Sequence, residues 1–199
     1  ELIHSRFKDG SAPDFDVVSG LARFLFGAGQ DTTSRLIAMG IRILGDDRKL
    51  QARMRREPAR IPDFLEEVLR YDAPVKVAYR IARRHTSVGD VEVPAGPIMT
   101  RCLTAASNDP RQFPDSARFD PDRSNVRSHM ACSRGAHGCL GAPLGRMEAR
   151  IEIERLLART AELRISEERH GPAGARRYRY EPTYSFRSLS DLHIEFTPA

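Results

Sequence analysis

The stretch Gly135-Ala136-His137-Gly138-Cys139-Leu140-Gly141-Ala142-Pro143 places a cysteine in a glycine-rich loop directly before a predicted helix. The N-terminus of a helix presents free N–H groups and positive potential, which favour a thiolate over a thiol. The pattern therefore predicts that Cys139 is a metal ligand or a nucleophile. A small buried cysteine in a turn is the alternative for a cysteine taken alone. A zinc site built from Cys132, His137 and Cys139 is disfavoured, because the paired spacings of structural zinc sites are absent.

Length and composition indicate one globular core. The chain has 199 residues, of which 40% are hydrophobic and 30% charged. Three cysteines at irregular spacing do not indicate a disulfide framework, so we expect a reducing compartment. No run approaches the roughly 18 apolar residues of a membrane span, which predicts a cytoplasmic protein without a membrane anchor. The chain opens on Glu1 rather than methionine, so we expect a fragment or a processed product.

The charge pattern bears on partners. The formal net charge is +5, from 32 basic against 27 acidic residues. The basic residues are scattered arginines without interleaved aromatic side chains, which predicts no nucleic-acid partner. Such a surface can still steer an acidic protein partner.

Periodicity and turn residues predict a mainly α fold with small β-sheets. In chain order we expect a long helix over 14–45, a helix over 62–71, an antiparallel β region over 75–104, an ordered loop over 108–138, a helix over 139–160 and a β-rich tail over 161–199.

The long helix carries the motif Ala28-Gly29-Gln30-Asp31-Thr32-Thr33, with a further glycine at Gly27. Each glycine costs about 1 kcal/mol relative to alanine in a helix interior, so close approach of another group or a local distortion is expected. A mid-helix threonine can donate its hydroxyl to a carbonyl one turn earlier and loosen the helix. A capping or surface cluster is the alternative, and this stretch alone leaves both open.

The second helix carries Glu67-Val68-Leu69-Arg70. Its apolar face is formed by Phe64, Leu65, Val68 and Leu69, so Glu67 and Arg70 fall on the opposite side. Periodicity alone therefore indicates a solvated pair worth about 0.3 kcal/mol.

The glycine-rich loop resembles the proximal loop of the cytochrome P-450 family, Phe-Gly-x-Gly-x-His-x-Cys-x-Gly. Residues 132–141 match its core, but Cys132 replaces an aromatic residue that packs beside the thiolate in the family, and Ser133 replaces a glycine. The resemblance implies that Cys139 is the axial thiolate of a haem b iron, where it pushes electron density onto the metal. It also implies that Arg80 and His137 bind the haem propionates.

The same resemblance assigns roles to residues outside the loop. Asp31 and Thr32 would form the proton relay that dioxygen activation requires. Glu67 and Arg70 would form a buried network with Arg118 that locks the proximal loop. The remaining assignments are haem contacts at Ala28, Gly29 and Gly141, and a substrate pocket lined by Phe26, Ala28, Lys76, Val77, Ala78, Ser185 and Phe186.

The implied reaction inserts one atom of dioxygen into a small organic substrate. Electrons would have to come from outside, because the chain has no Gly-x-Gly-x-x-Gly loop or flavin segment. The resemblance to soluble bacterial members of the family implies that they arrive from NAD(P)H through a ferredoxin and its reductase. Family members are about twice this length, so the resemblance covers the C-terminal half of the fold and implies that the N-terminal half is absent. A truncated, catalytically incompetent fragment or haem-binding remnant is the alternative. A haem sensor or carrier is a third possible function, and the presence of Asp31 and Thr32 disfavours it.

Overall fold

The computed structural model describes residues 4–199. Its elements, in chain order, are α1 (Phe15–Asp46), α2 (Arg48–Arg56), η2 (Pro58–Arg60), α3 (Ile61–Tyr71), β1 (Val77–Ile81), β2 (Thr86–Val88), β3 (Val91–Val93), β4 (Ile98–Cys102), α4 (Leu103–Ser107), η3 (Val126–Ser128), η4 (Gly135–His137), α5 (Ala142–Arg159), β5 (Thr160–Ile165), α6 (Glu167–His170) and β6 (Ile194–Pro198).

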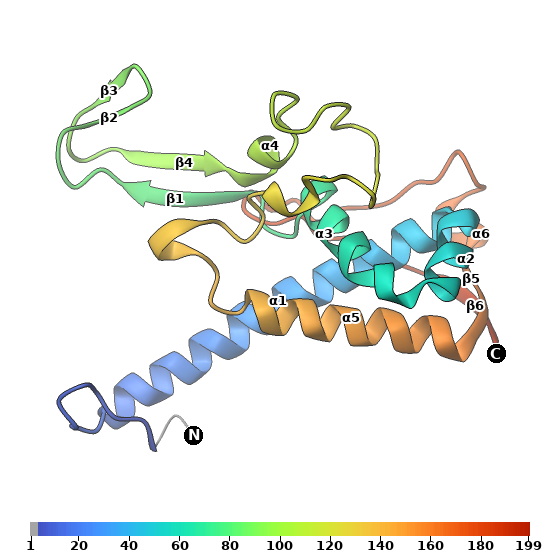
Figure 1. Ribbon diagram of the computed structural model, residues 1–199, viewed down its shortest axis with the longest axis horizontal. Helices are drawn as coiled ribbons and strands as arrows, with labels where there is room; N and C mark the ends of the chain where they lie inside the picture. Colours follow the sequence, from blue (N-terminus) through green and yellow to red (C-terminus); the bar gives the residue numbers. More distant parts are fainter. Residues whose placement is uncertain (1–3) are drawn as a thin grey trace.

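The long helix α1 packs along only part of its length. Leu36, Met39 and Leu44 in its C-terminal half are buried, whereas Phe24 and Phe26 in its N-terminal half are 68% and 71% exposed. In Figure 1 this N-terminal half extends beyond the helices against which the rest of α1 packs. The helix ends where Asp47 caps the next one, its carboxylate accepting the Leu50 N–H at 2.9 Å.

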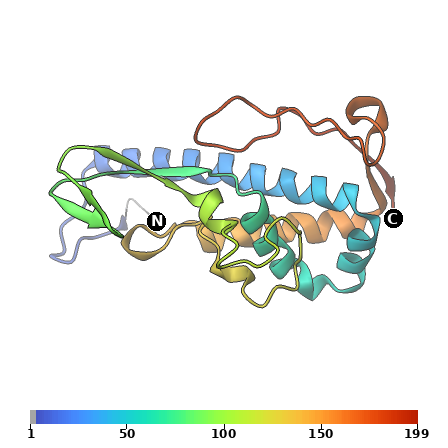
Figure 2. The same ribbon diagram turned by 90° about the horizontal axis from the view of Figure 1, so that it is seen from above.

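Three helices, α1, α3 and α5, form the main core. Phe64 of α3 and Ile153 of α5 are fully buried and meet at Gly40 of α1, where an added Cβ would lie 3.5 Å and 3.6 Å from their side chains. At Gly45 an added Cβ would lie 2.6 Å from Ile165 Cδ1, so a larger residue here would displace the Ile165 side chain of β5 from the α1 backbone. Figure 2 shows α5 along one side of α1 and the C-terminal tail along the other.

The strands form three two-stranded antiparallel sheets. The β1–β4 pair runs in register from Val77 opposite Cys102 to Ile81 opposite Ile98. The β2–β3 hairpin lies at its far end and turns through Gly89, whose φ of 58° favours glycine. The third sheet pairs β5 with β6.

Several elements differ from the sequence-based expectation. The tail is not β-rich: residues 171–193 are irregular, held by isolated bridges that join Val75 to Phe186 and Tyr180 to Leu189. The third long helix begins at Ala142, three residues after Cys139, which therefore lies in the loop. The short helices α2 and α4 were not expected. Helix α2 buries only Gln51 and Met54 and is otherwise rich in arginine. Its apolar face is therefore too narrow for the helix to be predicted from hydrophobic periodicity.

Within the described part of the chain, no helix is both long and apolar enough to cross a membrane.

Candidate functional site

The Cys139 loop is a series of tight turns that ends at the start of α5. The Gly138 N–H donates to the Gly135 carbonyl at 2.9 Å, and the Cys139 N–H donates to the Cys132 carbonyl at 2.9 Å. Cys139 is a free, exposed thiol, and an added Cβ on Gly141 would lie 3.9 Å from its Sγ. The thiol therefore lies beside the first turn of α5, where unpaired N–H groups stabilise a thiolate.

The loop is strained at Ser133. This residue has φ of 58°, in the left-handed region that favours glycine, and its Oγ is buried without a hydrogen-bond partner in the described chain. A non-glycine residue in this region costs roughly 1–2 kcal/mol. Serine at this position therefore makes the loop depend on contacts from outside it.

The motif on α1 lies next to the Cys139 loop because α1 crosses the first turns of α5 (Figure 1). An added Cβ on Gly145 of α5 would lie 3.1 Å from Thr33 Oγ1. One residue earlier, the Thr32 hydroxyl donates to the Ala28 carbonyl at 2.8 Å. Asp31 pairs with Arg35 at 2.9 Å, and its side chain is 48% exposed. Of the two interpretations of this stretch, the structure has the back-bonded threonine.

Phe26, Gly27 and Gly29 lie farther toward the N-terminus of α1. Within the described chain, an added Cβ at Gly27 or Gly29 would meet no other atom within 4 Å. No close approach inside this part of the molecule therefore explains these two glycines.

Glu67 and Arg70 are buried rather than solvated. Arg70 donates to both carboxylate oxygens of Glu67, at 2.7 Å and 2.8 Å, and both side chains are 0% exposed. Arg123 adds a contact from its Nε to Glu67 Oε1 at 3.3 Å, and the Asp120 N–H donates to the same oxygen at 2.8 Å. The family resemblance predicted this burial, and periodicity alone predicted the opposite.

The expectation for Arg118 is wrong. Its side chain is 68% exposed, and only its carbonyl joins the network, accepting from Arg70 at 3.2 Å. Arg123 is the third buried side chain, 9% exposed, and it donates to the carbonyls of Pro114, Asp115 and Arg118. The loop wraps around Arg123, which turns Arg118 outward. The sequence alone could not show which of these two arginines, five positions apart in one loop, has the buried side chain.

A second buried cluster, centred on Glu66, was missed by sequence reasoning. Glu66 accepts from Arg146 of α5 at 2.6 Å and 3.0 Å, and its Oε2 lies 2.9 Å from His129 Nε2. Burial alone would raise the pKa of Glu66, but the hydrogen bonds from His129 and Arg146 outweigh it and lower the pKa to about 2. Glu66 is therefore a buried carboxylate at neutral pH. No periodicity signals a contact between side chains 80 positions apart.

Two arginines share one face of the β1–β4 pair. Arg80 lies opposite Met99 and Ala78 lies opposite Arg101, so all four side chains lie on the same face. The Nε and Nη2 atoms of Arg101 are buried without a partner in the described chain. Arg80 is half-buried, and His137 is exposed on η4. A buried guanidinium without a carboxylate makes this face suited to an anionic group.

The residues predicted to line a pocket are only partly brought together. The Lys76 N–H donates to the Ser185 carbonyl at 2.8 Å, and the Arg35 guanidinium of α1 lies 5.0 Å from the Phe186 ring centre. The start of β1, the tail and α1 therefore meet here. Val77 and Ala78 lie on opposite faces of β1, and Phe26 and Ala28 lie on the exposed half of α1.

A family model described as Cytochrome P450 matches residues 61–167, which include the Glu67 network and the Cys139 loop. The chain belongs to the cytochrome P450 family. A putative cytochrome P450 140 of Mycobacterium tuberculosis is 37% identical over 179 residues, which are 90% of this chain and 39% of the relative. The cytochrome P450 monooxygenase PikC of Streptomyces venezuelae is 36% identical over 165 residues, 82% of this chain and 39% of that protein.

Solved structures that resemble this chain are also cytochromes P450. The substrate-free Mycobacterium marinum cytochrome P450 CYP150A6 superposes with a TM-score of 0.96 and 48% identity, over 98% of this chain and 48% of that one. CYP109Q5 from Chondromyces apiculatus follows with a TM-score of 0.88 and 32% identity, over 100% of this chain and 49% of that one. The chain thus spans less than half the length of these cytochromes P450. The predicted family and the helix-rich fold with small sheets are confirmed.

The haem that this family implies fits the residues present. Cys139 offers a free thiol at a helix N-terminus, and Arg101 offers buried N–H groups without partners on the Arg80 face. A thiolate and two cations are the donor set that an iron porphyrin with two propionates requires. In residues 4–199 no three His, Cys, Asp or Glu side chains lie close enough together to hold a metal ion.

Proposed function

We propose that this chain is the haem-binding part of a cytochrome P450 monooxygenase in which Cys139 is the thiolate ligand of haem b. The observation that carries the proposal is the free Cys139 thiol beside the first turn of α5, inside the span that the family model matches. When bound, the haem supplies the activation of dioxygen, one atom of which enters a small organic substrate.

The chain's own residues hold and orient this group. Arg80, His137 and the buried guanidinium of Arg101 would bind the propionates. Gly141 lies beside the Cys139 sulfur, and Ala28 and Gly29 would leave the α1 backbone free to face the haem.

Asp31 and Thr32 would deliver protons. The Thr32 hydroxyl is held by the Ala28 carbonyl, so its oxygen has a fixed place from which to donate or accept a proton. The half-exposed Asp31 carboxylate, paired with Arg35, can exchange protons with water.

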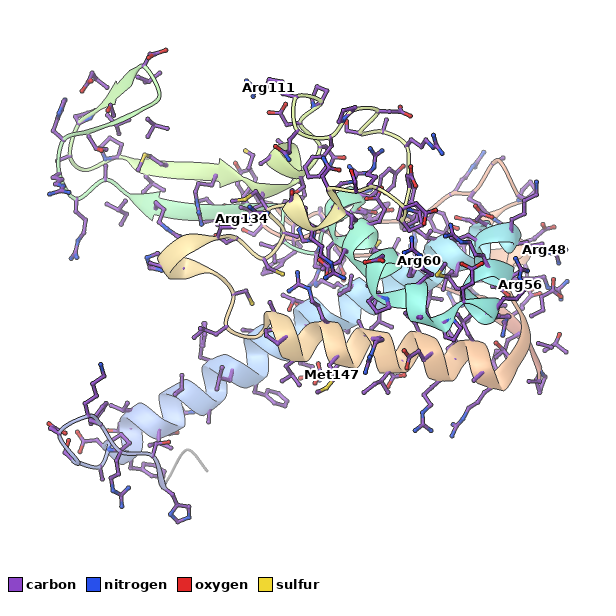
Figure 3. The ribbon with its side chains drawn as sticks, viewed as in Figure 1. Arg48, Arg56, Arg60, Arg111, Arg134 and Met147 are labelled. Carbon is purple, nitrogen blue, oxygen red and sulfur yellow. The ribbon has the colours of Figure 1, made fainter. Side chains whose placement is uncertain are left out.

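The substrate would lie near Lys76–Ala78, Ser185 and Phe186, with Phe26 and Ala28 at its far wall. Electrons from NAD(P)H would arrive through an acidic ferredoxin, which suits basic side chains around the proximal loop such as Arg134 (Figure 3).

Replacing Thr32 with alanine tests the relay. We expect haem content to be unchanged and electrons to divert to hydrogen peroxide, with product per NAD(P)H falling about 10-fold or more. The measurement is product, peroxide and NAD(P)H consumption by the full-length protein with a ferredoxin and its reductase. Ser34→Ala is the control, since Ser34 is exposed and, within residues 4–199, its hydroxyl bonds only the Asp31 carbonyl. Unchanged coupling in Thr32→Ala would exclude this role.

A second candidate function is that of a haem-binding piece without turnover. It is favoured by apolar side chains left uncovered on α1, among them Phe15 at 80% and Phe24 at 68% exposure, and by Leu140 at 93% in the loop before α5. Figure 3 shows Met147 on the outer side of α5. Apolar surface of this kind marks a surface that is covered by other protein or associates with it.

We therefore expect residues 1–199 alone to associate and to hold haem weakly, without coupled turnover. Titrating haem into this segment while following its monomer content and product formation tests the expectation. A stable monomer with one tightly bound haem and coupled product formation would contradict it.

A further inference from the structure

A continuous series of contacts joins α3 to the backbone of the proposed iron ligand. It begins at Glu66 on α3, whose side chain is 3% exposed, and passes to Arg146 on the second turn of α5. From Glu66 it also reaches His129, at the start of the segment that leads to Cys132, and the Cys132 carbonyl accepts the Cys139 N–H at 2.9 Å.

Arg146 is held rigidly on its Glu66 side. Its Nε lies 2.6 Å from Glu66 Oε1 and its Nη2 lies 3.0 Å from Oε2, a two-pronged geometry that fixes the plane of the guanidinium. Lysine cannot reproduce this arrangement, because an ammonium group is a point charge.

The Glu66 carboxylate that Arg146 holds also anchors the loop segment before Cys132: His129 contacts Glu66 through Nε2 and accepts the Ala131 N–H through Nδ1 at 3.2 Å. Residues 129–131, which Cys132 follows directly, are thus tied to a buried carboxylate.

The loop needs this support. Ser133, which follows Cys132, has the strained φ of 58° and a buried hydroxyl without a partner in the described chain. Cys132 also has a small side chain, so packing alone holds the segment weakly. Without the Arg146 contact, little would prevent the segment from relaxing and moving the Cys139 backbone bonded to it.

We propose that Arg146 is a positioning residue for Cys139, acting through Glu66 and His129 on the loop segment whose Cys132 carbonyl bonds the Cys139 N–H. The inference rests on the proposed haem-thiolate function and adds to it a residue that sets how firmly the ligand is held.

The experiment compares Arg146→Met with Arg150→Met in the full-length, haem-loaded protein. Arg150 lies one helical turn farther along α5, where its partner is the exposed Glu154 at 3.7 Å, so it controls for charge and helix position. We measure the rate of haem loss to an excess of haem-scavenging apoprotein and the spectrum of the reduced carbon monoxide complex. Arg146→Met should lose haem about 10-fold faster or more and show a partly blue-shifted band, whereas Arg150→Met should match wild type.

A double-mutant cycle separates positioning from general stability. If Arg146 acts through Glu66 and His129, the effects of Arg146→Met and His129→Leu on haem loss should be less than additive. Arg146→Lys, which keeps the charge near Glu66, provides a milder variant should Arg146→Met not fold, and it should still lose haem several-fold faster.

The outcomes are distinct. A wild-type protein without the thiolate spectrum would refute the proposed function itself. A wild-type thiolate spectrum with equal haem loss in Arg146→Met, Arg146→Lys and Arg150→Met would overturn only the role of Arg146. Strictly additive effects with His129→Leu would overturn the route through His129.

Discussion

Replacing Arg70 with methionine is expected to lower the free energy of unfolding by about 3–5 kcal/mol, the usual cost of leaving one partner of a buried ion pair uncompensated. Glu67 would lose two hydrogen bonds shorter than 2.9 Å while remaining 0% exposed. Arg123 and the Asp120 N–H would remain as its partners, and they compensate only part of the loss.

Urea denaturation of the full-length protein measures this change, with Arg111→Met as the control. Arg111 also pairs with a neighbouring carboxylate, Asp109, at 2.5 Å, but its side chain is 89% exposed (Figure 3). A surface pair of this kind contributes little, so Arg111→Met should leave the denaturation midpoint where it was. If both variants shifted the midpoint equally, the Glu67 network would not be the stabilising element we infer.

Loss of Arg70 should also affect the haem site. Its guanidinium donates to the Asn108 side chain at 2.9 Å and to the carbonyl of Arg118, and so ties α3 to the loop that leads to Cys139. The Glu66 cluster ties the same helix to residues 129–131. Two adjacent acidic residues on α3 thus anchor the two ends of one long loop.

The sequence allowed the local elements to be predicted, because they depend on local chemistry. Apolar spacing defined the long helix that runs from Phe15 to Asp46, and Pro62 and Pro74 bounded α3. The glycines around Cys139 marked a turn before a helix, which the structure has between Gly135 and Ala142.

Burial of charge could not be predicted from periodicity. A helix with one apolar face was expected to expose Glu67 and Arg70, but α3 is covered on almost all sides, and Glu66, Glu67 and Arg70 are at most 2% exposed. What covers them is a loop distant in sequence, whose path depends on backbone carbonyls gathered around Arg123. Only the family resemblance indicated the network, and it assigned the wrong arginine.

The second large effect is expected at Cys139. Serine cannot supply a thiolate, so Cys139→Ser should lose the electron-rich axial ligand, although Arg80, His137 and Arg101 would still attract the propionates. We therefore expect Cys139→Ser to bind haem more weakly and to lose monooxygenase activity completely.

The other cysteines provide matched controls. Cys132 is mostly buried, and burial raises the pKa of its thiol, so it is poorly suited to form a thiolate, even though Arg146 partly offsets that rise. Cys102 is exposed at the end of β4. Cys132→Ser and Cys102→Ser should therefore both keep the ligand.

The absorption spectrum of the reduced carbon monoxide complex of the full-length protein tests the central claim most directly. The account predicts the red-shifted band of a thiolate-ligated haem in the wild type, in Cys132→Ser and in Cys102→Ser, and its absence in Cys139→Ser. A red-shifted band that survives in Cys139→Ser and disappears in Cys132→Ser would contradict the account, because the iron ligand would then be Cys132.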